Sequence, residues 1–238
     1  MPDLRVLYLV IFLVLGVAAC TPEDNATPTT SDTAETTDQT TGEIDSEDAD
    51  PLTATYKNTD RVVWQRPNLI IALLGNGDLS EKVVADIGAG DGFFAKRLTP
   101  LTKKVIALDI DQNFLDLIDS EKVLELPTAV QDRLETRLTP RDAPLLEPEE
   151  VDAVLIVNTF MFIENKQEYL SKLKPCIKEG GRLVIVDFKR KRTAIGPRPR
   201  EYRAPLYQVE DLLYEAGYRN IQAIDTELNY QYILIAEV

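Results

Sequence analysis

Three glycines and two acids within residues 83–94 form the segment of this chain best suited to hold a ligand. The segment reads VVADIGAGDGFF, with an acid at Asp86 and glycines at Gly88, Gly90 and Gly92. Glycine adopts a positive φ without a Cβ clash, so the pattern predicts a buried strand, a sharp turn and a helix whose free amides face a ligand. At the carboxyl end of a parallel strand, such a turn binds a nucleotide-like cofactor.

A second acid, Asp109, ends the apolar run formed by residues 105–108. It follows the glycine turn by about 20 residues, the separation at which a nucleoside-binding fold places the carboxylate that accepts hydrogen bonds from the ribose. The alternative is that Asp109 only caps the next helix. With the glycine turn before it, we expect the ribose contact.

The glycine spacing argues against a dinucleotide. A dinucleotide turn has the pattern G-x-G-x-x-G, whereas here the third glycine comes one residue early and Phe93 stands in its place. The glycine spacing therefore makes a nicotinamide-dependent reductase the least favoured function for this chain.

Taken together, the residues from Asp86 to Gly92 resemble the first motif of the class I S-adenosylmethionine (SAM) dependent methyltransferases, and the resemblance extends over residues 60–238. It implies SAM as the cofactor, with Ile110 packed on the adenine face and Asp142 accepting from the adenine amino group. The residues that the resemblance places around the cofactor are Asp86, Gly88, Ala89, Gly90, Gly92, Asp109, Ile110, Asp142 and Asn158.

The elements around these residues alternate between strand and helix. Apolar runs predict strands at residues 83–87, 105–109, 151–157, 182–188, 220–225 and 232–237, and helical periodicity predicts helices at 112–122, 166–178 and 208–216, the second of them stopped by Gly180 and Gly181. We expect an α/β fold with a doubly wound, mostly parallel sheet, helices on both faces and an antiparallel C-terminal strand pair. The resemblance implies seven strands, as in the Rossmann-like methyltransferase fold.

Asn158 ends the apolar run 151–157 and is the candidate for orienting a methyl acceptor, because a polar amide at the end of a buried strand needs hydrogen-bond partners. The chain contains no histidine, which excludes histidine bases, Ser-His-Asp hydrolysis and histidine-ligated metals. No metal is expected. Related enzymes often carry a histidine near this position, so acceptor activation is left without an assigned residue.

Basic residues gather after the predicted strand 182–188, at Lys189 to Arg192, Arg198, Arg200 and Arg203. They form either a solvated loop or a patch for an anionic acceptor or a phospholipid surface. The acidic remainder of the domain gives no indication of a nucleic-acid partner.

The N-terminal 50 residues have a different composition from the rest. Residues 6–19 are an apolar run of 14, too short for a bilayer, and small residues precede Cys20 as in a bacterial lipobox. We predict a signal peptide at 1–19, lipidation of Cys20, a disordered acidic Thr-rich tether over 20–50 and one methyltransferase domain at 51–238; an uncleaved anchor is the alternative. The tether carries ten of the acids behind the net charge of −14, so the domain itself is only mildly acidic.

These observations favour a methyltransferase for a small or lipid-like acceptor, tethered in the bacterial cell envelope as a periplasmic or outer-membrane lipoprotein. Because SAM is made in the cytosol, the alternative is an inactive ligand-binding lipoprotein with the same fold. The intact Asp86 and Asp109 argue against that alternative, since a turn kept only for folding needs neither carboxylate.

Overall fold

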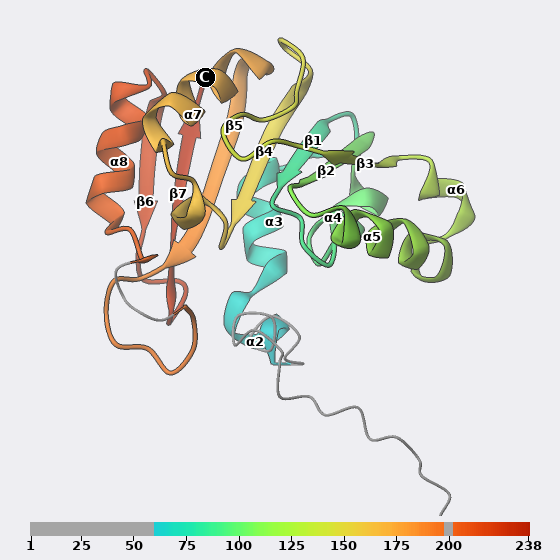
Figure 1. Cartoon of the computed structure of the whole chain (residues 1–238), viewed down its shortest axis with the longest axis horizontal. Helices are drawn as coiled ribbons and strands as arrows, with labels where there is room; N and C mark the ends of the chain where they lie inside the picture. Colours follow the sequence, from blue (N-terminus) through green and yellow to red (C-terminus); the bar gives the residue numbers. More distant parts are fainter. Residues whose placement is uncertain (1–59, 198–201) are drawn as a thin grey trace, which may run out of the picture. The chain divides into compact units, whose positions relative to one another are not determined.

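The computed structural model describes residues 60–197 and 202–238. A seven-stranded sheet in the order β3-β2-β1-β4-β5-β7-β6 forms the centre of this domain (Figure 1). The first five strands of the chain run parallel, and β7 pairs antiparallel with both β5 and β6. The expected doubly wound sheet with an antiparallel C-terminal pair is confirmed.

Helices precede the sheet and connect its strands. The strands are β1 Val83–Ile87, β2 Lys104–Asp109, β3 Leu134–Leu138, β4 Val151–Val157, β5 Ile177–Phe188, β6 Arg219–Ile224 and β7 Gln231–Glu237. The α-helices are α2 Arg61–Gln65, α3 Pro67–Gly75, α4 Ala95–Leu98, α5 Gln112–Glu125, α6 Thr128–Gln131, α7 Lys166–Leu173 and α8 Leu206–Glu215, and short 3-10 turns are η2 Thr99–Leu101, η3 Phe160–Phe162 and η4 Lys174–Cys176.

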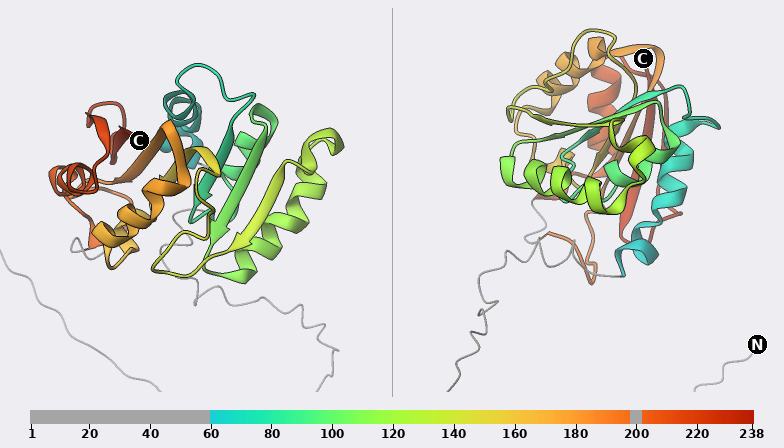
Figure 2. Two further views of the ribbon diagram at one scale, coloured as in Figure 1. Left: turned by 90° about the horizontal axis from the view of Figure 1, so that it is seen from above. Right: turned by 90° about the vertical axis from the view of Figure 1, so that its right-hand side faces the viewer.

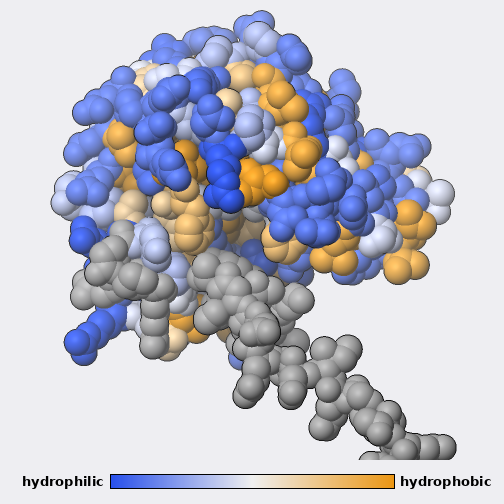
Figure 3. All heavy atoms as spheres, viewed as in Figure 1, coloured by the Kyte–Doolittle hydropathy of each residue, from blue (hydrophilic) through white to orange (hydrophobic). Residues whose placement is uncertain are grey.

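Two apolar cores separate the sheet from its helices, because alternate residues of each buried strand point to opposite faces. Helices α3, α4 and α5 pack on one face, with Ile70, Leu98 and Ile118 in that core. Helices α7 and α8 cover the other face through Leu170 and Leu213. The two views in Figure 2 show the helical layers on either side of the sheet, and on the face shown in Figure 3 hydrophilic side chains predominate, with smaller apolar patches between them.

The order of the strands determines where a ligand can bind. Strands β1 and β4 are neighbours, yet the chain winds outward from them in opposite directions, through β2 and β3 on one side and β5 on the other. The loops that follow β1 and β4 therefore separate at the carboxyl edge and leave a crevice between them.

Helices α2, α3 and α6 were not predicted, and two further elements differ from the sequence-based expectation. Strand β3 was not predicted, because only Leu134 is fully buried and the strand has no apolar run. The alternation of Leu134 and Thr136 with charged residues is too short a pattern to indicate a strand. The helix expected at 166–178 ends at Leu173. Pro175 then forms a 3-10 turn and β5 begins at Ile177, so Gly180 lies within the strand instead of ending the helix.

The predicted signal peptide, the lipidation site Cys20 and the tether lie outside the described residues. Among the helices that are described, none combines the length and the apolar character needed to cross a bilayer.

Asp187 is a buried acid that the fold tolerates at a cost. It is 0 % exposed near the end of β5, and neither carboxylate oxygen has a hydrogen-bond partner. Burial raises its pKa to about 8, although the ammonium of Lys166 opposes part of that rise. The carboxyl group is therefore kept mainly in its neutral form at pH 7.

Replacing Asp187 by asparagine is expected to flatten the pH dependence of stability. Because the folded pKa lies above the ordinary value of 3.8, the acid is most compatible with folding at low pH and loses stability as the pH rises from about 4 to about 8. Urea unfolding between pH 5 and pH 8.5 should show a smaller loss for Asp187→Asn than for the wild type. Asp132→Asn, which removes an exposed charge, is the control and should keep the wild-type slope.

Candidate active site

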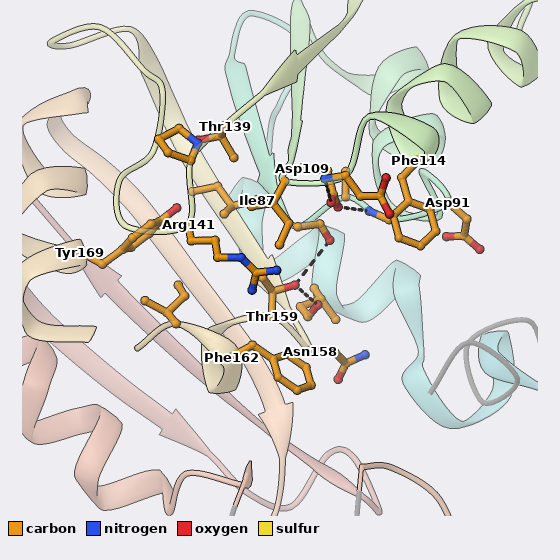
Figure 4. A pocket seen from close by; sticks show the side chains of 18 of the residues that line it. Ile87, Asp91, Asp109, Phe114, Thr139, Arg141, Asn158, Thr159, Phe162 and Tyr169 are labelled. Carbon is orange, nitrogen blue, oxygen red and sulfur yellow. Dashed lines mark hydrogen bonds between the residues drawn. The ribbon is translucent and has the colours of Figure 1, made fainter. Parts of the chain in front are cut away.

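A cavity of about 460 Å³ opens at the carboxyl edge of the sheet, at the crevice between β1 and β4 (Figure 4). Its wall is built mainly from residues at or just after the carboxyl ends of strands, together with Arg61 from α2, Phe114 from α5 and Tyr169 from α7. The lining residues are Arg61, Ile87, Gly88, Ala89, Gly90, Asp91, Asp109, Ile110, Asp111, Phe114, Thr139, Pro140, Arg141, Val157, Asn158, Thr159, Phe162, Ile163 and Tyr169.

The glycine turn forms the floor of the cavity and uses positive φ at Gly88 (73°), Gly90 (54°) and Gly92 (74°). The amide of Gly88 donates to the carbonyl of Leu108 at 2.8 Å, which anchors the turn to β2. A Cβ at Gly88 would lie 2.2 Å from Oγ1 of Thr159, whereas one at Gly90 would meet nothing within 4 Å. The turn therefore packs tightly against the loop after β4 and leaves open space above Gly90.

Asp109 lies at the end of β2, 7 % exposed, and faces the cavity. Its Oδ2 accepts from the amide of Gly90 at 2.8 Å, and its Oδ1 accepts from the amide of Asp111 at 3.0 Å. Each carboxylate oxygen can accept a further hydrogen bond, so the group is held in place by the backbone while it retains acceptor capacity toward a diol.

Asp86 lies beneath the turn and does not line the cavity. It is 3 % exposed, and its Oδ2 is buried without a hydrogen-bond partner. Burial raises its pKa to about 7, with the Arg61 guanidinium opposing the rise. A buried acid that titrates near neutral pH beside a ligand cavity is a group whose charge a bound cation would stabilise.

Arg61 closes the glycine end of the cavity from α2. Its Nε donates to Oε1 of Gln65 at 2.7 Å, and its Nη1 lies 3.5 Å from Oδ1 of Asp91. The guanidinium also stacks on Phe93, 3.9 Å from the ring centroid. Phe93, which stands where a dinucleotide turn has glycine, thus supports the arginine that covers this end of the site.

Asn158 lines the cavity at the end of β4 and is linked to α2 through a chain of buried amides. Gln65 donates to Gln231 at 3.4 Å, and Gln231 donates to Oδ1 of Asn158 at 2.5 Å. Because Arg61 can only donate, each amide in turn presents its oxygen toward Arg61 and its amino group onward. The last amino group, Nδ2 of Asn158, is buried and has no partner.

The wall opposite Asp109 is mainly apolar. Phe162 and Ile163 come from the segment after β4, and Tyr169 comes from α7 (Figure 4). Lys166 holds this segment, because its Nζ donates to the carbonyls of Met161 and Ile163. Burial raises the pKa of Tyr169, so its phenol remains neutral over the ordinary pH range. This wall can exclude water around a reacting group.

Of the predicted site residues, the cavity brings six together and leaves three outside its wall. Gly88, Ala89, Gly90, Asp109, Ile110 and Asn158 line it, whereas Asp86, Gly92 and Asp142 do not. Asp142 is turned outward because Thr139 folds the loop on itself: its Oγ1 donates to the carbonyl of Ala143 at 2.9 Å and accepts from the amide of Leu145 at 3.0 Å. Gly92 instead packs against Ile118, beneath the turn.

Sequence reasoning did not assign site roles to several lining residues. Tyr169 was expected in the core, Thr159 and Arg141 were given no role, and Phe162 was interpreted as either a residue of an apolar pocket or part of the core. Their common signal is a position just after a parallel strand, which could have identified all of them except Tyr169.

The basic cluster after β5 is partly structural. Arg203 is 3 % exposed and donates to four backbone carbonyls of the loop, those of Lys189, Lys191, Ile195 and Pro197. Lys189 donates to the carbonyls of Asp225 and Leu228. These two side chains therefore hold the loop together through its carbonyls, and an anion-binding role for the other basic residues of the cluster stays a prediction.

Gln231→Leu is expected to destabilise the domain by about 2–6 kcal/mol. The change leaves the Oδ1 of Asn158 and the Nε2 of Gln65 buried without partners, at about 1–3 kcal/mol each. Urea unfolding measures the loss. Gln222→Leu, at an exposed position of β6, is the control and should change stability by less than about 0.5 kcal/mol. A loss below 1 kcal/mol for Gln231→Leu would show that the amide chain is not coupled.

Residues 85–183 match a protein-family model described as a methyltransferase domain. Among curated proteins, the chain is similar to an uncharacterized methyltransferase of Schizosaccharomyces pombe, 26 % identical over 44 % of this chain and 38 % of the relative. It is also similar to the demethylmenaquinone methyltransferase of Tropheryma whipplei, 25 % identical over 61 % of this chain and 59 % of the relative. The chain thus spans less than two thirds of the length of these relatives.

Among solved structures, a SAM dependent methyltransferase from Aquifex aeolicus superposes with a TM-score of 0.67. It is 25 % identical and covers 79 % of this chain and 98 % of its own. The matched residues 85–183 include the glycine turn and Asp109, and the Aquifex aeolicus structure shares the fold described above.

Proposed function

We propose that this chain, which carries a class I SAM-dependent methyltransferase domain, is an enzyme that transfers a methyl group from SAM to a small or lipid-like acceptor. The observation that supports this most directly is the pairing of the glycine turn with Asp109 in one cavity of about 460 Å³. That cavity combines a nucleoside-binding edge with an apolar wall.

The residues of the cavity fit the chemistry of SAM. Asp109 retains acceptor capacity for the two ribose hydroxyls, and the space above Gly90 admits a ligand against the backbone. Arg61 provides a cation for a carboxylate at the glycine end, while the partnerless Oδ2 of Asp86 provides negative charge beneath it. Donor and acceptor groups therefore match a ligand with an amino-acid end and a nucleoside end.

When bound, SAM supplies an electrophilic methyl group on a sulfonium. The chain's own contribution is to hold a nucleophile in line with that methyl in a dry site, which can supply about 7–11 kcal/mol of the barrier. Asn158 orients the acceptor from the end of β4, and Phe162 and Ile163 exclude water. No histidine is present to act as a base, so an acceptor that is already nucleophilic suits this site.

Methyl transfer is tested with SAM labelled in its methyl group and a panel of small acceptors. Because a relative is named for demethylmenaquinone, a prenylated naphthoquinol belongs in the panel, beside phenols, thiols and amines. Formation of a labelled product together with S-adenosylhomocysteine supports the proposal. A folded protein that binds neither SAM nor S-adenosylhomocysteine would exclude it.

We further propose that the protein is a lipoprotein of the bacterial cell envelope, anchored through Cys20. The support is the apolar run at 6–19, the small residues before Cys20 and the acidic, Thr-rich stretch that follows. Mass spectrometry of the mature protein from a bacterial host tests this. Cleavage before Cys20 with added acyl mass is expected, and an intact Met1 with an unmodified Cys20 would refute the anchor.

A further inference from the structure

The loop after β3 turns a cation, and not its neighbouring acid, toward the cavity. Arg141 lines the wall, and Figure 4 shows its side chain extended into the cavity. The side chain of Asp142 is 72 % exposed, and Lys172 holds it outside, with Nζ 3.7 Å from Oδ2 and donating to the Asp142 carbonyl at 3.1 Å. The acid that the sequence offers for the cofactor's base is thus directed away from the site.

The order of the strands indicates where the base would lie, if the proposed function holds. Strand β2 carries the ribose acid Asp109, and the glycine turn that faces the amino-acid end follows β1 on one side of it. On the other side of β2 lies β3, which leads into Thr139, Pro140 and Arg141. A nucleoside whose ribose binds Asp109 therefore directs its base toward Ile110 and this loop.

The acidic side chains of the cavity wall lie toward the glycine turn and the end of β2, whereas the cation Arg141 lies on the loop after β3. These acids are Asp91, Asp109 and Asp111. Within residues 60–197 and 202–238, no carboxylate pairs with Arg141, so its guanidinium retains its donors for a ligand. The loop end of the cavity thus offers a strong donor.

A guanidinium and a carboxylate recognise different atoms of a purine. A carboxylate accepts from the 6-amino group of adenine, whereas a guanidinium only donates and needs a ring nitrogen or a 6-oxo oxygen. Arginine binds the adjacent O6 and N7 of a 6-oxopurine with two hydrogen bonds. A site that contacts the edge of the purine base only through arginine therefore cannot select for the 6-amino group of adenine.

We propose that Arg141 determines base recognition in this site, by donating to a ring nitrogen of the cofactor's purine, and that the 6-amino group is not read by a carboxylate. This inference rests on the proposed function. Its consequence is an unusual tolerance for a cofactor whose base carries a 6-oxo group.

The test is calorimetric binding of S-adenosylhomocysteine and of S-inosylhomocysteine, in which the 6-amino group is replaced by an oxo group. Because a guanidinium can donate to O6 as well as to a ring nitrogen, we expect the wild type to bind S-inosylhomocysteine at least as tightly as S-adenosylhomocysteine. Arg141→Met keeps the apolar stem but removes the donors, so it should weaken both ligands about tenfold, as expected for loss of a charged donor. Arg141 is exposed, so the variant should fold.

Asp142→Asn is the matched control, because it changes the neighbouring residue without touching the cavity wall. It should leave both affinities within twofold of the wild type. Rejection of S-inosylhomocysteine by more than 30-fold, with that rejection lost in Asp142→Asn, would overturn the inference in favour of Asp142. Wild-type affinities in Arg141→Met would overturn it as well. If the folded wild type binds neither ligand, the proposed function itself fails.

Discussion

Asp109→Ala is expected to weaken the binding of S-adenosylhomocysteine by at least about 100-fold. The carboxylate can accept from both ribose hydroxyls, and hydrogen bonds to a charged group contribute about 1.5–3 kcal/mol each. Losing two of them corresponds to a factor of 100 or more. The substitution also removes the acceptor for the amides of Gly90 and Asp111, so the turn loses its support at the same time.

Calorimetry on the purified protein measures this effect, and two further variants resolve its cause. Asp109→Asn preserves the shape and one acceptor oxygen, and should fall between the wild type and Asp109→Ala. Asp116→Ala removes an acid from α5 that does not line the cavity, so it controls for net charge and should bind as the wild type does. Less than a tenfold loss in Asp109→Ala would mean that Asp109 only supports the turn and the next helix.

The fold could be predicted from the sequence where a buried strand produces a run of apolar residues. Strands β1 and β4 are largely buried and read as apolar runs, each interrupted by a single acid, Asp86 in residues 83–87 and Asp152 in residues 151–157. Strand β3 lies at the sheet edge and is only half-buried, so its pattern is weak. The early end of α7 depends on Pro175, whose effect was underestimated beside the later glycines.

Site residues could be predicted from the sequence only where the backbone conformation or the end of a strand restricts the residue type. Gly88 and Gly90 were predicted because positive φ favours glycine, and Asp109 because it ends a buried strand. The outward turn of Asp142 depends on the hydroxyl of Thr139 and on Lys172, 30 residues away, and no local pattern contains it. The amide chain to Asn158 likewise joins three distant segments through side-chain geometry.

Gly88→Ala is expected to be the most destabilising single change in the turn, with a loss of about 2–5 kcal/mol. A left-handed φ costs a residue with a Cβ about 1–2 kcal/mol. In addition, the new Cβ would lie 2.2 Å from Oγ1 and 2.7 Å from Cβ of Thr159, and relieving such overpacking costs about 1–3 kcal/mol. The turn and the loop after β4 would have to separate, which also opens the cavity floor.

Gly90→Ala isolates the two contributions, because its φ of 54° carries the same backbone penalty while its Cβ would meet nothing within 4 Å. It should lose only about 1–2 kcal/mol in urea unfolding. Thr159→Ala combined with Gly88→Ala removes part of the clash and should recover some of the loss. Equal losses in the two glycine variants would instead show that backbone strain alone sets the cost, and that the contact between Gly88 and Thr159 does not restrain the turn.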